Sequence, residues 1–322
     1  MKTIGVLTSG GDAPGMNACI RAIVRSGISR GLEVLGIRRG YCGILDEDFT
    51  ELGSRSVANI IHRGGTILET ARCEELKMEE GIRKAAEILR GHAIEGLITV
   101  GGDGTFRGAA ALAEAGETRV IGVPGTIDND VYGTDYAIGF DTAINTALDA
   151  IDKIRDTAGS LQRPFFVEVM GKSRGFIALE VGIAGGAEEI LIPELETNIE
   201  ELCLDIRRSF SKGKKSTIVI VAEGDDAGGA LSIAQQVWER LRIEYRICVL
   251  GHVQRGGSPT ARDRVLASKL GAAAVDALVD GRSGCMVGEL KGDMTLTPLR
   301  ETWEKRKELD SNSLRLIKVL AS

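Results

Sequence analysis

The feature that most restricts the fold of this chain is a repeated pattern of apolar run, glycine turn and helix. Residues 3–8 and 96–100 are short apolar runs, and each is followed by a glycine-rich turn and a helical pattern. Such runs are typical of strands buried on both faces of a parallel sheet. Further runs occupy residues 32–37, 120–124, 165–170, 189–192, 217–221, 247–250 and 285–287. This alternation predicts an α/β protein whose parallel sheets carry helices on both faces.

Helices are predicted from apolar residues that recur with the helical period. The first helix is expected to bury Ile20, Ile23, Val24 and Ile28 on one face. Thr197, with Glu200 three positions later, predicts a capping box at the start of a helix over 197–211. The remaining helices are expected at 78–90, 140–157, 230–242 and 259–280, with a charged helical region at the C-terminal end.

Glycine is unusually abundant, with 42 of 322 residues, whereas a typical share is about 7%. With 6 prolines and no low-complexity tract, this abundance indicates sharp turns and close backbone approaches. The turns lie at 9–15, 63–65, 101–104, 171–175 and 251–257. Carboxyl ends of parallel strands share one edge of a sheet, so these turns can converge on one cleft. A strand, glycine turn and helix also direct backbone N–H groups at phosphate.

Net charge and cysteine usage restrict the binding partners and the cellular compartment of the protein. The formal net charge of −6 argues against bulk binding of nucleic acid or an anionic membrane. The six cysteines are scattered, without a Cys-x-x-Cys pair, which favours free thiols in a reducing compartment. The first strand begins within three residues of the N-terminus, and no apolar run reaches the ~18 residues of a membrane span. We therefore expect a cytoplasmic protein.

Two acids, Asp128 and Asp130, follow within six residues of the run at 120–124. If the loop is extended there, their side chains point the same way. One can then accept a proton while the other orients a partner or holds a metal. The alternative is ordinary turn chemistry, in which backbone amides satisfy the Asp-Asn-Asp sequence.

The turn Gly101-Gly-Asp-Gly-Thr105 contains a single acid, Asp103. Its glycines let the backbone close on a polyphosphate, and the carboxylate can reach the Mg²⁺ of that polyphosphate. The alternative is an Asx-turn that caps the following helix. On the first helix, Arg21 and Arg25 repel each other at i, i+4, which indicates either an anion between them or a solvated face.

The polar side chains around these turns combine few acids with many cations. The acids are Asp103, Asp128, Asp130 and Glu223, and the cations are Arg72, Arg163, Lys172, Arg246, His252 and Arg255. This balance suits a pair of phosphorylated substrates with one or two Mg²⁺. Three histidines and no Gly-x-Ser-x-Gly leave little from which to build a nucleophile triad. The residues therefore predict phosphoryl transfer by positioning and charge stabilisation, without a covalent intermediate.

The motifs together resemble those of bacterial ATP-dependent 6-phosphofructokinases, the phosphofructokinase A family, over residues 3 to about 290. They are Gly10-Gly-Asp-Ala-Pro-Gly-Met-Asn17, Gly101-Gly-Asp-Gly-Thr105, Pro124-Gly-Thr-Ile-Asp-Asn-Asp130, Met170-Gly171 and Gly251-His-Val-Gln-Arg-Gly-Gly-Ser-Pro259. The resemblance implies two doubly wound, mostly parallel α/β domains with the active site in the cleft between them. It implies an ATP-binding domain (1–138 plus 256–300) and a fructose 6-phosphate-binding domain (139–255 plus 301–322). It also implies a homotetramer with shared active sites.

The resemblance also implies a role for each matching residue. Asp128 would be the general base for the 1-hydroxyl of fructose 6-phosphate, with Thr126 and Asp130 orienting that hydroxyl and the metal. Further catalytic contacts would come from Lys172 and Gly11. ATP would contact Gly11, Arg72, Cys73, Gly102, Asp103, Gly104 and Thr105, with Asp103 on Mg²⁺. The sugar phosphate would contact Met170, Gly171, Lys172, Glu223, His252 and Arg255, and a neighbouring subunit would supply Arg163 and Arg246.

The phosphoryl donor can be read from two positions. Family members that use pyrophosphate carry Asp in place of Gly104 and Lys in place of Gly125, so the glycines here predict ATP as co-substrate. The alternative is a pyrophosphate-dependent or dual-donor enzyme, because the sequence after Met170 resembles the mixed-substrate branch. A non-catalytic regulatory subunit is a further alternative. Lys172 stands where the ATP enzymes usually have Arg, and whether Lys172 or Arg174 serves the transferred group is left open.

An effector site is implied by cations that match the family's regulatory cleft. They are Arg21, Arg25, Arg155, Lys212 and Lys214, together with the acid Glu188. Three positions depart from the family pattern: Ser54-Arg55 inverts the expected placement of Arg, Asn59 replaces an Asp, and Ser216 replaces a His. We therefore expect an anion-binding effector cleft in which control by ADP or phosphoenolpyruvate is weak or absent.

Overall fold

The computed structural model describes residues 1–161, 163–214 and 216–320. The chain divides into two compact units. Unit 1 comprises Met1–Ile127, Val131–Thr142 and Arg255–Lys307, and unit 2 comprises Asp128–Asp130, Ala143–Gln254 and Glu308–Ser322. Unit 1 is built on a mostly parallel sheet, and unit 2 on a parallel sheet. These sheets confirm the predicted α/β class with more than one parallel sheet.

Unit 1 contains a seven-stranded sheet in the order β11-β10-β5-β4-β1-β2-β3. Its strands are β1 (Thr3–Thr8), β2 (Glu33–Ile37), β3 (Phe49–Glu51), β4 (Gly96–Gly101), β5 (Arg119–Pro124), β10 (Cys285–Leu290) and β11 (Asp293–Pro298). The two edge strands, β3 and β11, pair antiparallel with their neighbours. All residues of β1 and β4 are buried, because helices cover both faces of the central strands.

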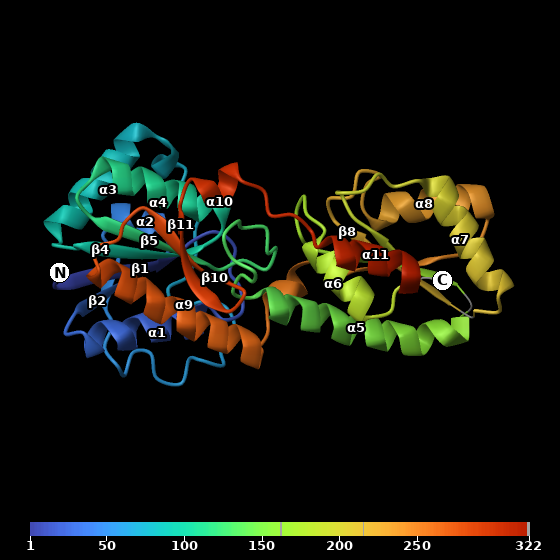
Figure 1. Ribbon diagram of the computed structural model, residues 1–322, viewed down its shortest axis with the longest axis horizontal. Coiled ribbons are helices and arrows are strands. Elements are labelled where there is room, and N and C mark those ends of the chain that lie inside the picture. Colours follow the sequence, from blue (N-terminus) through green and yellow to red (C-terminus); the bar gives the residue numbers. More distant parts are fainter. Residues whose placement is uncertain (162, 215, 321–322) are drawn as a thin grey trace. The chain divides into compact units, whose positions relative to one another are not determined.

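The helices of unit 1 form two layers. They are α1 (Met16–Ser29), α2 (Tyr41–Leu45), the 3₁₀ turn η1 (Glu75–Lys77), α3 (Glu79–Gly91), α4 (Asp103–Ala115), α9 (Ala261–Val279) and α10 (Glu301–Glu304). Helices α1 and α9 pack together on one face, and α3 and α4 lie together on the other (Figure 1). Their approach is close at Gly271, where a Cβ would lie 2.8 Å from the carbonyl oxygen of Cys19.

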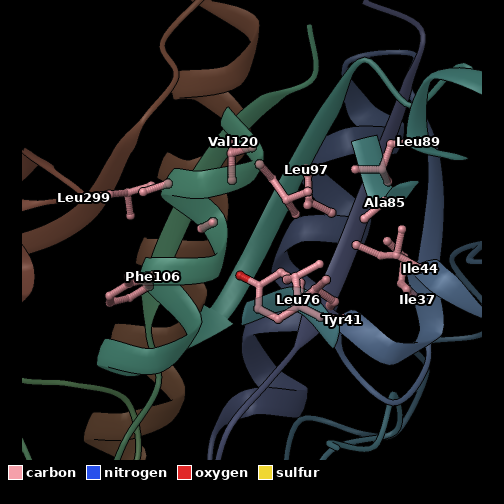
Figure 2. Packing of buried hydrophobic residues seen from close by; sticks show 14 of the residues in the cluster. Ile37, Tyr41, Ile44, Leu76, Ala85, Leu89, Leu97, Phe106, Val120 and Leu299 are labelled. Atoms are coloured by element: carbon pink, nitrogen blue, oxygen red, sulfur yellow. The ribbon is translucent and has the colours of Figure 1, made fainter. Parts of the chain in front are cut away.

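One core cluster of unit 1 lies between the sheet and the layer that contains α3 and α4. Figure 2 shows part of this cluster, in which Leu97 and Val120 of the sheet pack with Phe106 of α4 and Tyr41 of α2. The predicted apolar face of α1 is correct at Ile20, Ile23 and Val24, which are fully buried. The prediction is wrong at Ile28, which is 39% exposed, because it lies in the last turn of the helix.

Unit 2 contains a four-stranded parallel sheet in the order β7-β8-β6-β9. Its strands are β6 (Pro164–Val169), β7 (Glu189–Leu191), β8 (Thr217–Ala222) and β9 (Arg246–Val249). Its helices are α5 (Phe140–Leu161), α6 (Phe176–Ala184), α7 (Ile199–Ser211), α8 (Ala230–Leu241), the 3₁₀ turn η2 (Gly251–Arg255) and α11 (Ser311–Leu320). The first turn of α5 and the last residue of η2 belong to unit 1. Helix α8 packs on β6 and on α7, whereas α6 packs on β8 and on α11 (Figure 1).

Two local predictions are corrected by the structure. Asn198, rather than Thr197, caps α7, and its Oδ1 accepts hydrogen bonds from Glu200 N and Glu201 N. The Thr197 hydroxyl instead donates to Asp225 Oδ2 at 2.9 Å. The charged C-terminal region is not helical throughout, because Lys291 and Gly292, both with positive φ, form a tight turn from β10 into β11.

Candidate functional site

The first and third glycine turns lie side by side in unit 1, at the carboxyl ends of β1 and β4. Ser9 N donates to Val100 O at 3.0 Å, and Thr105 Oγ1 donates to Ser9 O at 3.0 Å. A Cβ on Gly101 would lie 2.2 Å from Thr105 Oγ1, so glycine is required for this contact. Two turns that precede helices therefore expose backbone N–H groups at one edge of the sheet.

The second turn (63–65) is held to the start of α1 by the side chain of Asn17, and it packs closely against the fifth turn (251–257) where Gly64 meets Gly257. The Asn17 side-chain amide donates to the carbonyls of Arg63 and Gly64, both at 3.1 Å. A Cβ on Gly64 would lie 2.3 Å from Gly257 O. Four of the five predicted turns thus reach unit 1, and the turn at 171–175 belongs to unit 2.

Arg255 lies over the first turn. A Cβ on Gly11 would lie 3.0 Å from Arg255 Nη1, so a larger residue there would require the guanidinium to shift. A guanidinium next to a glycine turn before a helix is suited to bind phosphate. The structure therefore brings Gly11, predicted for ATP, together with Arg255, predicted for the sugar phosphate.

Helix α2 connects two segments that were predicted to bind ATP. The Tyr41 hydroxyl donates to Thr105 O, and Cys42 Sγ donates to Arg72 O at 3.2 Å. The Arg72 side chain is exposed, and Cys73 is half-buried. Sequence reasoning did not find Tyr41, because a single aromatic residue in a five-residue helix has no recognisable motif.

Asp103 is the first residue of α4 and does not cap it. The N-cap position is Gly102, which makes no side-chain cap bond, and Asp103 Oδ1 accepts from Arg107 Nε at 2.9 Å. Across the described parts of the chain, no three His, Cys, Asp or Glu side chains are grouped to hold a metal. In phosphate-bound sites Mg²⁺ uses one or two carboxylates together with phosphate oxygens. Asp103, whose side chain is 47% exposed at a helix N-terminus, fits that arrangement.

Asp128 forms an ion pair in unit 2. Its Oδ2 lies 2.7 Å from Lys172 Nζ, and its side chain is 4% exposed. The expected extended loop is wrong: Asp128 lies in a turn, and Asn129 has φ +53°. Asn tolerates this left-handed conformation. Because the chain turns at Asn129, the side chains of Asp128 and Asp130 are not expected to point the same way as they would on an extended strand. Asp128 is buried, whereas Asp130 is only half-buried.

Glu223 holds the turn that presents Lys172. Its Oε1 accepts from Gly171 N at 3.2 Å and from Lys172 N at 2.7 Å. Lys172 has φ +52°, a conformation that costs energy in a non-glycine residue and concentrates at functional sites. A Cβ on Gly224 would lie 2.0 Å from Lys172 O, so the glycine after Glu223 is part of the same packing.

Two further residues fix this region, and sequence reasoning did not find either. Gln254 is fully buried, and its Oε1 accepts from Met170 N at 2.9 Å. Glu194 accepts from Gly175 N at 3.0 Å and lies 3.5 Å from Arg174 Nε. The structure therefore pairs Lys172 with Asp128 and Arg174 with Glu194.

The remaining predicted substrate residues are spread over both units. Thr126 is buried, and its Cβ lies 3.6 Å from the position of a Cβ on Gly102. Arg163 Nη2 lies 2.7 Å from Glu244 Oε2, and Arg246, on the edge strand β9, donates to Tyr245 O at 2.9 Å. His252 is exposed in η2.

The predicted effector residues of unit 2 lie around its β7 edge. Arg155 Nη2 donates to Gly185 O at 2.6 Å, and Lys214 Nζ lies 3.8 Å from Glu188 Oε1. Lys212 and Lys214 line a pocket of about 520 Å³. Arg21 and Arg25 lie on α1 of unit 1, where Arg25 is exposed.

That pocket is also lined by Glu189, an acid whose pKa is raised. Burial raises the pKa of Glu189 to about 7, and the carboxylates of Asp205, Glu201 and Glu188 add to the rise. Lys214 acts in the opposite direction. The pocket therefore holds a carboxyl group that changes charge near neutral pH.

In the described residues, no helix has both the length and the apolar character needed to cross a membrane.

Comparison with known proteins gives one consistent family. The phosphofructokinase family profile matches residues 3–278. ATP-dependent 6-phosphofructokinase 1 of Thermus thermophilus is 60% identical over 321 residues, with 100% of both chains covered. The ATP-dependent 6-phosphofructokinase of Shouchella clausii is 52% identical, again over 100% of both chains.

Two solved structures are similar to this chain. Phosphofructokinase from Saccharomyces cerevisiae is 34% identical with a TM-score of 0.87, covering 99% of this chain and 46% of that chain. A pyrophosphate-dependent phosphofructokinase from Marinobacter aquaeolei has a TM-score of 0.85 at 22% identity, covering 100% of this chain and 92% of that chain. The second similarity concerns the fold alone.

Proposed function

This chain belongs to the phosphofructokinase family, and from that membership we infer that it is an ATP-dependent 6-phosphofructokinase. It transfers the γ-phosphoryl group of ATP to the 1-hydroxyl of fructose 6-phosphate and yields fructose 1,6-bisphosphate and ADP, a step of glycolysis. The observation that carries the chemistry is the buried Asp128 carboxylate, which lies 2.7 Å from Lys172 Nζ.

Asp128 acts as the general base. It takes the proton of the 1-hydroxyl while that oxygen forms its bond to the γ-phosphorus, and the bond from phosphorus to the ADP oxygen breaks. Thr126 and Asp130 orient the hydroxyl, and they would also orient the metal ion when it is bound. Lys172 supplies positive charge to the transferred group, a role supported by its position at Asp128 and by its strained backbone.

Unit 1 supplies the ATP contacts. We assign them to Gly11, Arg72, Cys73, Gly102, Asp103, Gly104 and Thr105. Asp103 is the residue that would hold Mg²⁺, which offsets the negative charge of the polyphosphate. The functional domains are proposed as 1–138 plus 256–300 for ATP and 139–255 plus 301–322 for the sugar phosphate.

The sugar phosphate contacts are assigned to Met170, Gly171, Lys172, Glu223, His252 and Arg255. Arg163 and Arg246 are assigned to the site of a neighbouring subunit in a cytoplasmic homotetramer. The exposure of Arg246 on an edge strand supports this assignment. The effector cleft is assigned to Arg21, Arg25, Arg155, Glu188, Lys212 and Lys214, with weak or absent control by ADP or phosphoenolpyruvate.

Asp128→Asn tests the reaction and the base together. We expect activity with ATP, fructose 6-phosphate and Mg²⁺ in the wild type, and a fall in kcat of about 10²–10⁴-fold in the variant, because the amide does not accept the proton. Initial rates are measured with ATP and, separately, with pyrophosphate. Asp149→Asn is the matched control, since this acid of unit 2 is 70% exposed and its replacement should leave kcat unchanged.

Each outcome has a distinct meaning. Activity with pyrophosphate alone would overturn the choice of ATP. An Asp128→Asn enzyme with wild-type kcat would overturn the assignment of the base. If the folded wild type is inactive with both donors, the chain is a non-catalytic regulatory subunit instead of an enzyme.

A further inference from the structure

A short segment of unit 2, residues 192–198, connects two elements that are fixed in the fold. It follows the edge strand β7, which pairs with β8, and it precedes α7, whose N-cap is Asn198. Within the segment, Leu195 N donates to Ile192 O at 3.1 Å. We call residues 192–198 the strap. Because both of its ends are held, the positions of its side chains are restrained.

The first half of the strap contacts the turn at 171–175. Gly175 N donates to Glu194 Oε1 at 3.1 Å and to Oε2 at 3.0 Å, and Arg174 Nε lies 3.5 Å from Glu194 Oε1. A Cβ on Gly175 would lie 2.6 Å from Ile192 Cβ, so the backbone of the turn lies directly on the strap. The Glu194 side chain is 18% exposed, so these interactions are largely shielded from water.

The second half of the strap contacts the loop that begins at Glu223. Thr197 Oγ1 donates to Asp225 Oδ2 at 2.9 Å, and Thr197 N donates to Asp226 Oδ1 at 3.1 Å. Asp225 is buried, and its Oδ1 accepts from Ala227 N at 3.0 Å. The Thr197 hydroxyl therefore contacts a carboxylate that also holds the backbone of this loop.

Both of these segments contact the backbone of Lys172. Glu223 Oε1 accepts from Gly171 N and Lys172 N, and a Cβ on Gly224 would lie 2.0 Å from Lys172 O. Lys172 has φ +52°, a conformation that persists only when the surrounding structure imposes it. The strap thus holds the turn that contains Lys172 and also the loop that packs against it.

We propose that the strap positions Lys172 for phosphoryl transfer, with Glu194 and Thr197 as its two anchors. The inference rests on the proposed function, in which the Lys172 ammonium group acts on the transferred group. Glu194 and Thr197 are positioning residues, because they act through Gly175 and Asp225 and not on a substrate. Positioning matters for the rate, since a displacement of about 1 Å can cost about a hundredfold.

The carboxylates of Glu194 and Glu223 also determine how the turn can act on a phosphoryl group. A glycine turn before a helix usually directs its N–H groups at an anion, and α6 begins directly after Gly175. Here the N–H groups of Gly171, Lys172 and Gly175 donate to the two carboxylates. The turn therefore acts on a phosphoryl group through the Lys172 side chain, whose placement depends on both carboxylates.

Hydrogen exchange of single backbone amides tests whether the strap holds the turn. Glu194→Ala removes the acceptor of Gly175 N, but it leaves the Glu223 acceptor of Gly171 N and Lys172 N in place. We expect all three amides of the full-length protein to exchange at least about tenfold faster in this variant. Faster exchange at Gly175 alone would overturn the proposal, because Glu194 would then be only a local cap of α6.

Thr197→Val tests the second anchor with little change in side-chain volume. It removes the hydroxyl that donates to Asp225, while it keeps the backbone N–H that donates to Asp226. We expect faster exchange at Gly171 and Lys172 in this variant, and Thr197→Ser should restore the wild-type rates. Unchanged exchange at these two amides in Thr197→Val would overturn the role of Thr197 as an anchor.

A double-mutant cycle tests the consequence for the reaction. We expect Glu194→Ala to lower kcat about tenfold and to leave the KM for ATP unchanged, since the proposed ATP contacts all belong to unit 1. Glu194→Gln keeps one acceptor oxygen for Gly175 N and should retain more activity. In the Lys172→Met background, Glu194→Ala should lower kcat by less than about twofold, because Glu194 acts through Lys172.

Glu196→Ala is the matched control, because it replaces an exposed acid of the same strap. Its kcat and its exchange rates should equal those of the wild type. Thermal unfolding shows whether each variant is folded, and if Glu194→Ala is not, the cycle is made with Glu194→Gln.

The full loss of kcat in the Lys172→Met background would overturn the proposal, because Glu194 would then act independently of Lys172. If the wild type has no activity with ATP, or if Lys172→Met keeps the wild-type kcat, the proposed function of Lys172 fails. Hydrogen exchange still decides in that case whether the strap holds the turn.

Discussion

At the scale of single residues, Lys172 distinguishes this chain from the usual family pattern. Its ammonium group pairs with the buried Asp128, while Arg174 is engaged by Glu194 and lies 5.5 Å over the Phe176 ring. A lysine keeps the charge of an arginine but not its two-pronged grip on phosphate. The geometry therefore favours Lys172, and not Arg174, as the residue that serves the transferred group.

Lys172→Met and Arg174→Lys separate the two cations. We expect Lys172→Met to lower kcat at least about tenfold, because a charge aimed at the transition state is worth several kcal/mol. Lys172→Arg should retain more activity than Lys172→Met, and Arg174→Lys should keep kcat near the wild-type value. Steady-state kinetics with saturating substrates measure kcat of each variant and show which of the two cations serves the transferred group. A larger loss in Arg174→Lys than in Lys172→Met would reverse the assignment.

Gly104 and Gly125 were both interpreted as signs of an ATP site, yet their surroundings differ. A Cβ on Gly104 meets no atom within 4 Å, whereas a Cβ on Gly125 would lie 2.9 Å from Val100 Cγ1. We expect Gly104→Asp to fold with an unchanged Tm and to raise the KM for ATP by placing a carboxylate near the phosphates. Gly125→Ala should lower stability by about 1–3 kcal/mol through overpacking. Thermal unfolding and ATP kinetics check both, and an unstable Gly104→Asp would contradict the open space.

The sequence predicted those residues of the site that belong to local motifs. Asp103 and Asp128 stand within short motifs, so their types and spacing were recognisable. Gln254 and Glu194 act instead through side-chain hydrogen bonds to backbone atoms distant in sequence. Gln254 lies within the motif 251–259, but the motif does not say which backbone atom its side chain contacts, and Glu194 belongs to none of the quoted motifs. Both contacts therefore required the fold.

At the scale of elements, the start of α9 is anchored by a buried carboxylate. Asp263 is 1% exposed, and it accepts from Gly139 N at 2.9 Å and from Thr142 N at 2.8 Å. It also accepts from the Thr142 hydroxyl at 2.5 Å. One side chain thereby connects α9 to the segment that enters α5, within unit 1.

Asp263→Asn should destabilise this connection. The amide retains one acceptor oxygen but directs N–H groups at other donors, so we expect a loss of about 1–3 kcal/mol in the free energy of unfolding. Asp276→Asn is the control on the same helix, since its carboxylate is 49% exposed in an ion pair with Arg30, and its effect should be below about 1 kcal/mol. Denaturant unfolding compares the two, and equal losses would contradict the anchoring role.

The element predictions succeeded where strands are buried on both faces and failed at the edges of the seven-stranded sheet. Strands such as β1 and β4 are continuous apolar runs, so their existence and bounds were recognisable. β3 has three residues, and β11 is mostly exposed, so neither has an apolar run or a clear alternation. Helix α2 has five residues, and it is held by its tertiary contacts rather than by its own residue pattern.

At the scale of the whole molecule, the stability of the fold depends on the charge of Glu189. Its pKa rises from 4.5 to about 7 in the folded state, mainly through burial. The folded protein therefore holds a proton that the unfolded chain has released over this range. The stabilisation is complete below about pH 4.5 and is lost as the pH rises through about 7.

Glu189→Gln removes this dependence. At pH 8 we expect the variant to be more stable than the wild type by up to about 3 kcal/mol, and at pH 5 the difference should be smaller. Urea unfolding at both pH values measures it. Glu196→Gln serves as the control, because it replaces an exposed acid of the same pocket. A pH-independent difference between wild type and Glu189→Gln would contradict the titration of this group.

The discontinuous composition of the two units affects how the protein is made. Strand β10 pairs with β5, and α11 packs on α6, so each unit receives an essential piece from the last part of the chain. A ribosome makes residues 285–320 after the other strands and helices of both units. The nascent polypeptide meanwhile carries β5 with an open edge, which is prone to pair with other chains. The seven-stranded sheet therefore stays open along β5 during synthesis until residues 285–290 have left the ribosome, and growing chains need protection over that interval.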